Sequence, residues 1–153
     1  THGRITLYEY LGDSWGVLFS HPADFTPVCT TELGETARLL PEFTKRNVKV
    51  LGLSCEGVES HKIWVEDIKV FNKLPDVGFP IIADEDRSIS RTFGMLRADD
   101  EDSAPVRALY VINPAKKVAL VITYPGTTGR NFVEVLRAID SVQMTANYDV
   151  ATP

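Results

Sequence analysis

The sequence predicts an α/β domain in which a central mixed β-sheet carries helices on both faces. Two observations support this prediction. Short apolar runs of strand composition alternate with segments of helical periodicity, and two later apolar runs around a turn are followed by a last amphipathic segment. The chain has 153 residues, a length that suits one domain, so we expect a single domain over residues 1–153.

The first expected strand is the apolar run from Trp15 to Ser20. A Gly-Asp pair precedes it and Pro22 follows it, which is typical of a buried strand. A polar turn then leads to Pro27, a residue type favoured in the first turn of a helix. Helical periodicity continues from Cys29 to Arg46, and we expect a bend at Pro41 because proline lacks a backbone donor.

The rest of the chain continues this alternation. Over Val58 to Phe71, the helical period places Trp64, Ile68 and Phe71 on one face. The acidic run from Asp99 to Asp102 is expected to be a solvated loop. The other expected elements are strands at Lys49–Ser54 and Phe79–Ala83, a short helix over Arg87–Phe93, and a hairpin of Leu109–Ile112 and Val118–Thr123. A final helix is expected from Asn131, with a capping box formed by Asn131 and Glu134. Its inner face would carry Phe132, Val135, Leu136 and Ile139.

Composition argues against several classes of function. The chain has 16 Lys and Arg against 21 Asp and Glu, a formal net charge of −5, and no basic stripe, so nucleic-acid binding is not expected. No apolar run approaches the roughly 18 residues of a membrane helix, so no membrane span is expected. Two cysteines are too few for a disulfide scaffold, and His2, His21 and His61 lack metal-ligand spacing, so no metal site is expected.

Cys29 is the candidate for chemistry, because it falls at the expected start of a helix. Backbone N–H groups there have no intrahelical partner and the helix dipole is positive, and both effects favour a thiolate. Thr26, three residues earlier, offers a hydroxyl that can donate to the sulfur or to a bound oxygen. From position alone, a buried structural cysteine, which is the usual state of a free cysteine, remains an open interpretation.

The segment from Pro22 to Leu33 resembles the active-site segment of the peroxiredoxins, which has the form P-x-x-F-T-x-x-C-x-x-E. The Ser-His-Pro triplet ending at Pro22 and the Thr-Thr pair after Cys29 look like the 1-Cys subgroup. The resemblance covers nearly the whole chain, including the segment from Thr127 to Phe132. It implies a thioredoxin-like fold. It also implies a thiol peroxidase that reduces hydrogen peroxide and organic hydroperoxides, phospholipid hydroperoxides among them, in antioxidant defence and redox homeostasis.

The resemblance implies a role for each matched residue. Cys29 would be the peroxidatic thiolate, which attacks the terminal peroxide oxygen and becomes a sulfenic acid. Thr26 would hydrogen-bond the sulfur and the incoming peroxide, and Pro22 would shield the sulfenate from water. Arg107 would stabilise the thiolate and the transition-state charge. The family usually has two residues between a Pro-Val pair and this arginine. Here that pair directly precedes Arg107 after a shorter loop, but the register is restored beyond the strand, so Arg107 is kept as the match.

Three further residues would support this centre. Arg130 matches the second arginine that lines the pocket, and Glu32 matches the carboxylate that orients the two guanidiniums. His21 is a feature of the subgroup. It would tune the thiolate, bridge to a partner, or serve only as a satisfied packing histidine.

Two other nucleophilic residues are given lesser roles. Cys55 lies where family resolving cysteines do not, so it is interpreted as a non-resolving thiol. Ser14 matches the nucleophile-elbow pattern G-x-S-x-G, but a strand follows it where an elbow requires a helix. Some 1-Cys relatives use this serine for a phospholipase activity with a histidine and an aspartate. Those two positions are Tyr8 and Ala115 here, so the activity is disfavoured.

The resemblance implies no bound cofactor. Turnover would need an external thiol reductant (glutathione, thioredoxin or another thiol), delivered in some relatives by a glutathione transferase. A homodimer or higher homo-oligomer is also implied. We expect the N-terminal segment and the C-terminal dimerisation extension of the subgroup to be absent from this chain. A peroxide sensor and a holdase chaperone remain alternatives, whereas a disulfide reductase is disfavoured because no CxxC motif is present.

No basic segment followed by an apolar core opens the chain, and this indicates a cytoplasmic protein. A mitochondrion or another organelle remains an open alternative, although no targeting segment is visible. Since Thr1 is not an initiator methionine, an upstream piece is expected.

Overall fold

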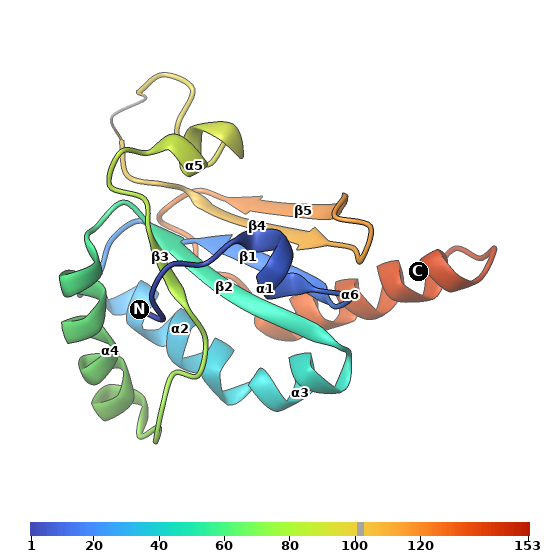
Figure 1. The fold of residues 1–153 in the computed structure, drawn as a ribbon, viewed down its shortest axis with the longest axis horizontal. Coiled ribbons are helices and arrows are strands. Elements are labelled where there is room, and N and C mark those ends of the chain that lie inside the picture. Colours follow the sequence, from blue (N-terminus) through green and yellow to red (C-terminus); the bar gives the residue numbers. More distant parts are fainter. Residues whose placement is uncertain (101–102) are drawn as a thin grey trace.

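The computed structural model describes residues 1–100 and 103–153, which form one five-stranded sheet with helices around it (Figure 1). The strand order is β3-β2-β1-β4-β5. β1 pairs in parallel with β2, which pairs in parallel with β3, whereas β4 is antiparallel to both β1 and β5. The predicted mixed sheet is therefore confirmed. The strands are β1 (Trp15–Ser20), β2 (Val48–Ser54), β3 (Ile81–Ala83), β4 (Arg107–Ile112) and β5 (Val118–Tyr124).

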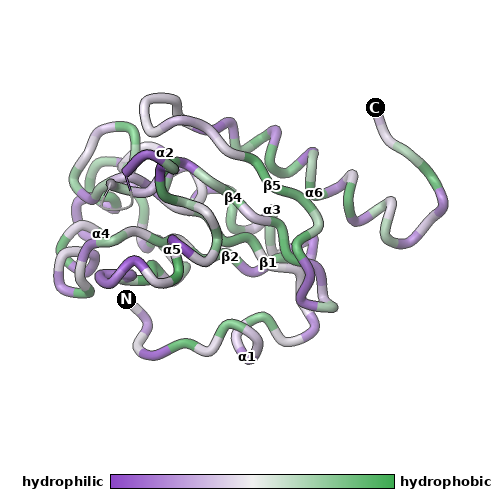
Figure 2. Tube along the Cα trace, turned by 90° about the horizontal axis from the view of Figure 1, so that it is seen from above, coloured by the Kyte–Doolittle hydropathy of each residue, from purple (hydrophilic) through white to green (hydrophobic). Residues whose placement is uncertain are grey.

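Helices cover both faces of the sheet, as predicted. Neighbouring residues of a strand point to opposite faces, so Phe19 joins a large core cluster beneath α2, α3, α4 and α6, whereas Leu18 joins a smaller one with residues of α1 and α5. Figure 2 shows hydrophobic residues gathered along the central strands. The helices are α1 (Leu7–Leu11), α2 (Pro27–Arg38), α3 (Leu40–Lys45), α4 (Val58–Asn72), α5 (Ser88–Thr92) and α6 (Phe132–Asn147).

The helix expected over Cys29–Arg46 is two helices rather than one bent helix. α2 ends at Arg38, its C-cap Leu39 has a ψ of 0° that lies outside the helical range, and α3 begins at Leu40. Pro41, the second residue of α3, has no N–H to donate back into α2, and its ring would clash with a carbonyl one turn earlier. Instead of the predicted bend at Pro41, the chain therefore has a complete break between two helices, and the break lies at Leu39, two residues earlier.

The prediction that Phe71 shares one face with Trp64 and Ile68 is wrong, because 66% of its surface is exposed whereas both other side chains are fully buried. On α4 the inward row runs from Trp64 through Ile68 to Asn72, in steps of four residues. The Asn72 amide is satisfied inside because it donates to the carbonyls of Thr30 (3.1 Å) and Ile68 (3.0 Å). A Cβ on Gly34 would lie 2.1 Å from the Asn72 side chain, so glycine permits this close approach between α2 and α4.

The remaining differences are smaller. The sequence did not predict α1. β3 begins at Ile81 rather than Phe79, directly after a proline that cannot donate to a β-ladder. Asn131 caps α6 by accepting from Val133 and Glu134 N–H groups, but the Glu134 carboxylate accepts from Arg137 instead of completing the capping box. Of the expected acidic loop, Asp99 is exposed, and residues 101–102 lie outside the described residues. Within the described part, no helix is long and apolar enough to cross a membrane.

The strand directions bring three distant segments to one edge of the sheet. β1 ends there and continues through residues 21–26 into α2. Because β4 is antiparallel to β1, its first residue, Arg107, lies beside the end of β1. Tyr124, the last residue of β5, pairs with Arg107, so the loop leading to Arg130 starts at the same edge.

Candidate active site

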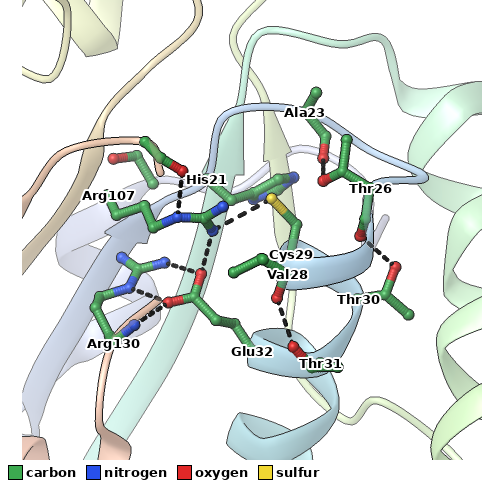
Figure 3. Close-up of polar contacts among 12 residues, drawn as sticks. His21, Ala23, Thr26, Val28, Cys29, Thr30, Thr31, Glu32, Arg107 and Arg130 are labelled. Atoms are coloured by element: carbon green, nitrogen blue, oxygen red, sulfur yellow. Dashed lines mark hydrogen bonds and ion pairs between the residues drawn. The ribbon is translucent and has the colours of Figure 1, made fainter. Parts of the chain in front are cut away.

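Cys29 lies at this edge, in the first turn of α2, and it is fully buried (Figure 3). Pro27 begins the helix and Thr26, in an extended conformation, precedes it. The Nη1 group of Arg107 donates to the Cys29 sulfur at 3.3 Å. A helix N-terminus and a guanidinium therefore both act on one sulfur atom, and both stabilise negative charge.

One buried carboxylate organises the two arginines of the site. Glu32, one helical turn after Cys29, accepts from Arg107 Nη1 at 2.5 Å, and from Arg130 through its backbone N–H (2.7 Å), Nε (2.9 Å) and Nη2 (3.0 Å). Arg107 also donates Nε to the Gly126 carbonyl at 2.9 Å. The Arg130 guanidinium packs over the Phe19 ring at 4.9 Å. These contacts leave each guanidinium one orientation, with Arg107 directed at the sulfur.

Pro22 and Thr26 lie on the loop that leads from β1 to Cys29. A Cβ on Gly126 would lie 3.4 Å from Pro22, so this proline packs against the loop between β5 and α6. The Thr26 hydroxyl donates to the Ala23 carbonyl at 2.9 Å, so the predicted hydrogen bond from Thr26 to the sulfur is not the one the structure shows. Because its proton is engaged, the Thr26 oxygen offers lone pairs, which suits it to accept from a peroxide O–H.

The protonation of Glu32 links this site to stability. Burial raises the pKa of Glu32, but the hydrogen bonds and charges of Arg130 and Arg107 outweigh burial and hold the pKa below its ordinary value of 4.5. A group with a depressed pKa contributes stability above its unfolded-state pKa and loses that contribution as the pH falls. The network should therefore stabilise the protein fully at neutral pH and weaken in acid.

Glu32→Gln should lower the free energy of unfolding by about 3 kcal/mol or more at pH 7, because it leaves two buried guanidiniums without their counter-charge. Urea unfolding of both proteins across the pH range checks this. The difference between them should shrink as the pH falls below 4.5, where Glu32 of the unfolded wild-type chain begins to bind a proton, and should be lost once the pH falls through the lower pKa of the folded carboxyl. A difference that stays constant down to about pH 3 would contradict this assignment.

His21 is fully buried beside the site and belongs to a polar network that the sequence did not predict. Its Nε2 lies 2.9 Å from Asp24, whose other carboxylate oxygen lies 2.7 Å from both His61 Nδ1 and Ser60 Oγ. The ring of His21 packs on Trp64 at a centroid distance of 4.9 Å. Asp24 stands inside the matched segment and His61 was noted in the sequence, but no spacing signal joins them because they are 37 residues apart.

Among the described residues, His21, Asp24 and Glu56 are the three whose possible metal-ligating atoms lie within 4.8 Å of one another. Their oxygens are already engaged, since Glu56 accepts from the Asp24 N–H (3.2 Å) and from Ser54 Oγ (2.5 Å). We therefore assign these residues to the hydrogen-bond network rather than to a cation.

The other two nucleophiles, Cys55 and Ser14, have hydrogen-bond partners outside the network around Cys29. Cys55 follows β2 and contacts Ser90 Oγ at 3.7 Å, and burial raises its pKa, so it has little thiolate character. Ser14 precedes β1 and donates to Asn47 at 2.8 Å. The strand predicted after Ser14 is present, so the serine does not stand in a nucleophile elbow. Tyr8 is exposed and offers no imidazole base.

The chain is similar to several known proteins of one family. The family model described as the AhpC/TSA family matches residues 1–121. The mitochondrial peroxiredoxin PRX1 of Saccharomyces cerevisiae is 55% identical over all of this chain, which spans 61% of that protein's length. A crystal structure of a mutant peroxiredoxin 6 of Arenicola marina aligns with a TM-score of 0.92 and 50% identity, covering 97% of this chain and 70% of that one.

A structure of a yeast mitochondrial 1-Cys peroxiredoxin aligns equally well, with a TM-score of 0.91 and 54% identity over 97% of this chain and 73% of that one. That yeast structure concerns a thiol resolving mechanism through the glutathione and thioredoxin systems. These alignments confirm the thioredoxin-like fold and the resemblance to the 1-Cys subgroup that the sequence indicated.

Proposed function

The chain belongs to the AhpC/TSA family, among the 1-Cys peroxiredoxins, and on that premise we propose that it is a thiol peroxidase acting on hydrogen peroxide and organic hydroperoxides, including phospholipid hydroperoxides. One observation supports this most strongly. The fully buried sulfur of Cys29 stands in the first turn of α2, 3.3 Å from a guanidinium nitrogen of Arg107. The helix start and the guanidinium both stabilise negative charge at the sulfur, which attack on a peroxide requires.

The first chemical step oxidises Cys29. The thiolate attacks the terminal oxygen of the peroxide, an S–O bond forms and the O–O bond breaks. The departing alkoxide or hydroxide takes a proton and leaves as alcohol or water, and the cysteine becomes a sulfenic acid. Negative charge migrates from sulfur to the leaving oxygen, so a donor already fixed along that path stabilises the transition state more than the ground state.

The surrounding residues fit this step. Arg107 donates to the sulfur, while Glu32 and Arg130 keep its guanidinium in one orientation. The Thr26 oxygen, whose own proton goes to Ala23, is suited to accept from the peroxide O–H and orient it. Pro22, packed toward Gly126, is suited to exclude water from the sulfenic acid.

The second step needs a reductant from outside. One thiol attacks the sulfenic sulfur, water leaves and a mixed disulfide forms; a second thiol then releases Cys29 and becomes oxidised. The step requires no prosthetic group. Glutathione and thioredoxin are the proposed classes of reductant, because the related yeast structure concerns thiol resolution through both systems. Delivery by a glutathione transferase remains part of this proposal.

Turnover distinguishes a peroxidase from a sensor or a holdase chaperone. Peroxide mixed with the protein and excess dithiol should be consumed over many cycles, whereas a sensor oxidises once and then rests.

Cys55→Ser should turn peroxide over at the wild-type rate, because the raised pKa of Cys55 leaves it mostly as thiol. Mass spectrometry should find the oxygen on Cys29 in both proteins. Oxidation that stops at one equivalent would overturn the peroxidase, and loss of turnover in Cys55→Ser would assign it a resolving role.

The proposal extends to the assembly and the location of the protein. β5 is an edge strand with exposed apolar residues, among them Val118 and Val121, and this supports a homodimer or larger homo-oligomer. We keep the cytoplasm as the expected location, with the mitochondrion as its alternative because one relative, 55% identical, is named mitochondrial.

A further inference from the structure

Asp24 is a buried carboxylate that the peroxidase chemistry described above does not use. It accepts from three side chains: His21 Nε2 at 2.9 Å, His61 Nδ1 at 2.7 Å and Ser60 Oγ at 2.7 Å. Burial by itself raises the pKa of Asp24, but these hydrogen bonds outweigh burial and hold the pKa well below its ordinary value. The group is therefore an anion that can only accept.

This anion determines which nitrogen of His21 carries the proton. A carboxylate accepts, so Nε2 of His21 must be the N–H that donates to it. Burial lowers the pKa of His21 more than the Asp24 hydrogen bond raises it, so the ring is neutral and Nδ1 carries a lone pair. Nδ1 is buried and has no hydrogen-bond partner among the described residues. By fixing the proton on Nε2, Asp24 leaves Nδ1 of His21 as an unpaired acceptor, one residue before Pro22.

The same carboxylate ties the active-site loop to α4. Ser60 and His61 belong to the first turn of α4, and Asp24 lies midway between Pro22 and Thr26, the two residues assigned to the peroxide site. The Asp24 N–H donates to Glu56 at 3.2 Å, which adds a contact to the segment after β2. Four polar contacts at one residue therefore fix the path of residues 21–26, whereas the Thr26 hydroxyl contributes a local bond to Ala23.

We propose that Asp24 is a positioning residue of the peroxidase: it fixes His21 as its Nε2–H tautomer and anchors the loop that carries Pro22 and Thr26 to α4 through Ser60 and His61. The expected effect on the oxidation rate rests on the proposed function, whereas the predicted tautomer of His21 does not. Misplacement of a substrate-contacting group by about 1 Å costs up to about 10²-fold in rate. Loss of the Asp24 anchor should have an effect of that kind.

The test uses Asp24→Asn, with Asp67→Asn, which changes an exposed aspartate of α4, as the matched control. An asparagine keeps the size of the side chain, but its NH2 group cannot accept, so at least one of the three donors loses its partner. Nitrogen-15 NMR of the imidazoles should show a single Nε2–H tautomer for His21 in the wild type and a mixture in Asp24→Asn. Stopped-flow oxidation of Cys29 by hydrogen peroxide should be about 10- to 100-fold slower in Asp24→Asn and unchanged in Asp67→Asn.

Each outcome decides the proposal. An Nδ1–H tautomer of His21 in the wild type overturns it without any variant. A folded Asp24→Asn protein with the wild-type oxidation rate also overturns it, as does a slower Asp24→Asn protein in which the His21 tautomer is unchanged. If Asp24→Asn does not fold, Ser60→Ala removes one donor only and should slow oxidation by about 3-fold or more while the wild-type tautomer persists; an unchanged rate counts against the anchor. A wild-type protein that peroxide does not oxidise at Cys29 would sink the proposed function and leave the predicted tautomer of His21 standing.

Discussion

Replacing Cys29 by serine should reduce peroxide consumption to the uncatalysed background while the protein stays folded. A serine hydroxyl is almost entirely protonated at neutral pH, and its neighbour Arg107 is a donor rather than a general base, so the hydroxyl is not activated to attack the peroxide. The fold should tolerate the change because the serine oxygen can still accept from Arg107 Nη1 near the position where the sulfur accepts at 3.3 Å. We expect the free energy of unfolding to change by about 1 kcal/mol or less.

The measurement is peroxide consumption with excess dithiol, with Cys55→Ser as the matched cysteine control. Both variants lose one thiol, but only Cys29 stands at a helix start beside a guanidinium. Equal rates in the wild type and in Cys29→Ser would remove the peroxidase assignment. Loss of activity in Cys55→Ser alone would transfer the chemistry to the other thiol.

Most of the fold could be predicted because its elements have strong local signals. β1 is an apolar run closed by a proline, and α6 carries an inward row from Phe132 to Ile139 behind an Asn131 cap. The failures have local causes too. α1 has five residues, too few for a periodic pattern. Apolar spacing predicts Phe71 on the face of Trp64 and Ile68, whereas the structure buries Asn72 there by satisfying its amide.

The candidate site could be predicted from the sequence only in part. The residues of the loop and of α2 around Cys29 could be named because they stand together in one segment with a family motif. Arg107 is 78 residues from Cys29, so only the antiparallel pairing of β4 with β1 brings it to the sulfur. The direction of a hydrogen bond is a further step beyond sequence, as the Thr26 hydroxyl shows by donating to Ala23. The Asp24 network went unpredicted for the same reason, since its donors on α4 meet it only in the folded chain.

Arg107→Gln should lower the rate constant for oxidation of Cys29 by hydrogen peroxide by about 10²- to 10³-fold, the loss typical when one fixed donor to a developing charge is removed. Glutamine keeps a hydrogen-bonding amide but has no positive charge, and it cannot reach the sulfur, Glu32 and Gly126 together as the guanidinium does. The fold should survive, because Glu32 keeps its contacts with Arg130.

Arg107→Gln and Glu32→Gln together separate the effect of the network on the chemistry from its effect on stability. In the first variant the buried carboxylate still has a cation, so chemistry should fail with stability largely kept; in the second, two buried cations lose the anion they share, so stability should fail first. Arg137→Gln, which breaks an exposed pair with Glu134 on α6, is the matched control and should change neither. Stopped-flow oxidation and urea unfolding on the same preparations measure both quantities. An Arg107→Gln rate within about 3-fold of the wild type would mean that the donor 3.3 Å from the sulfur does not act on the transition state, and that the helix N-terminus carries the stabilisation alone.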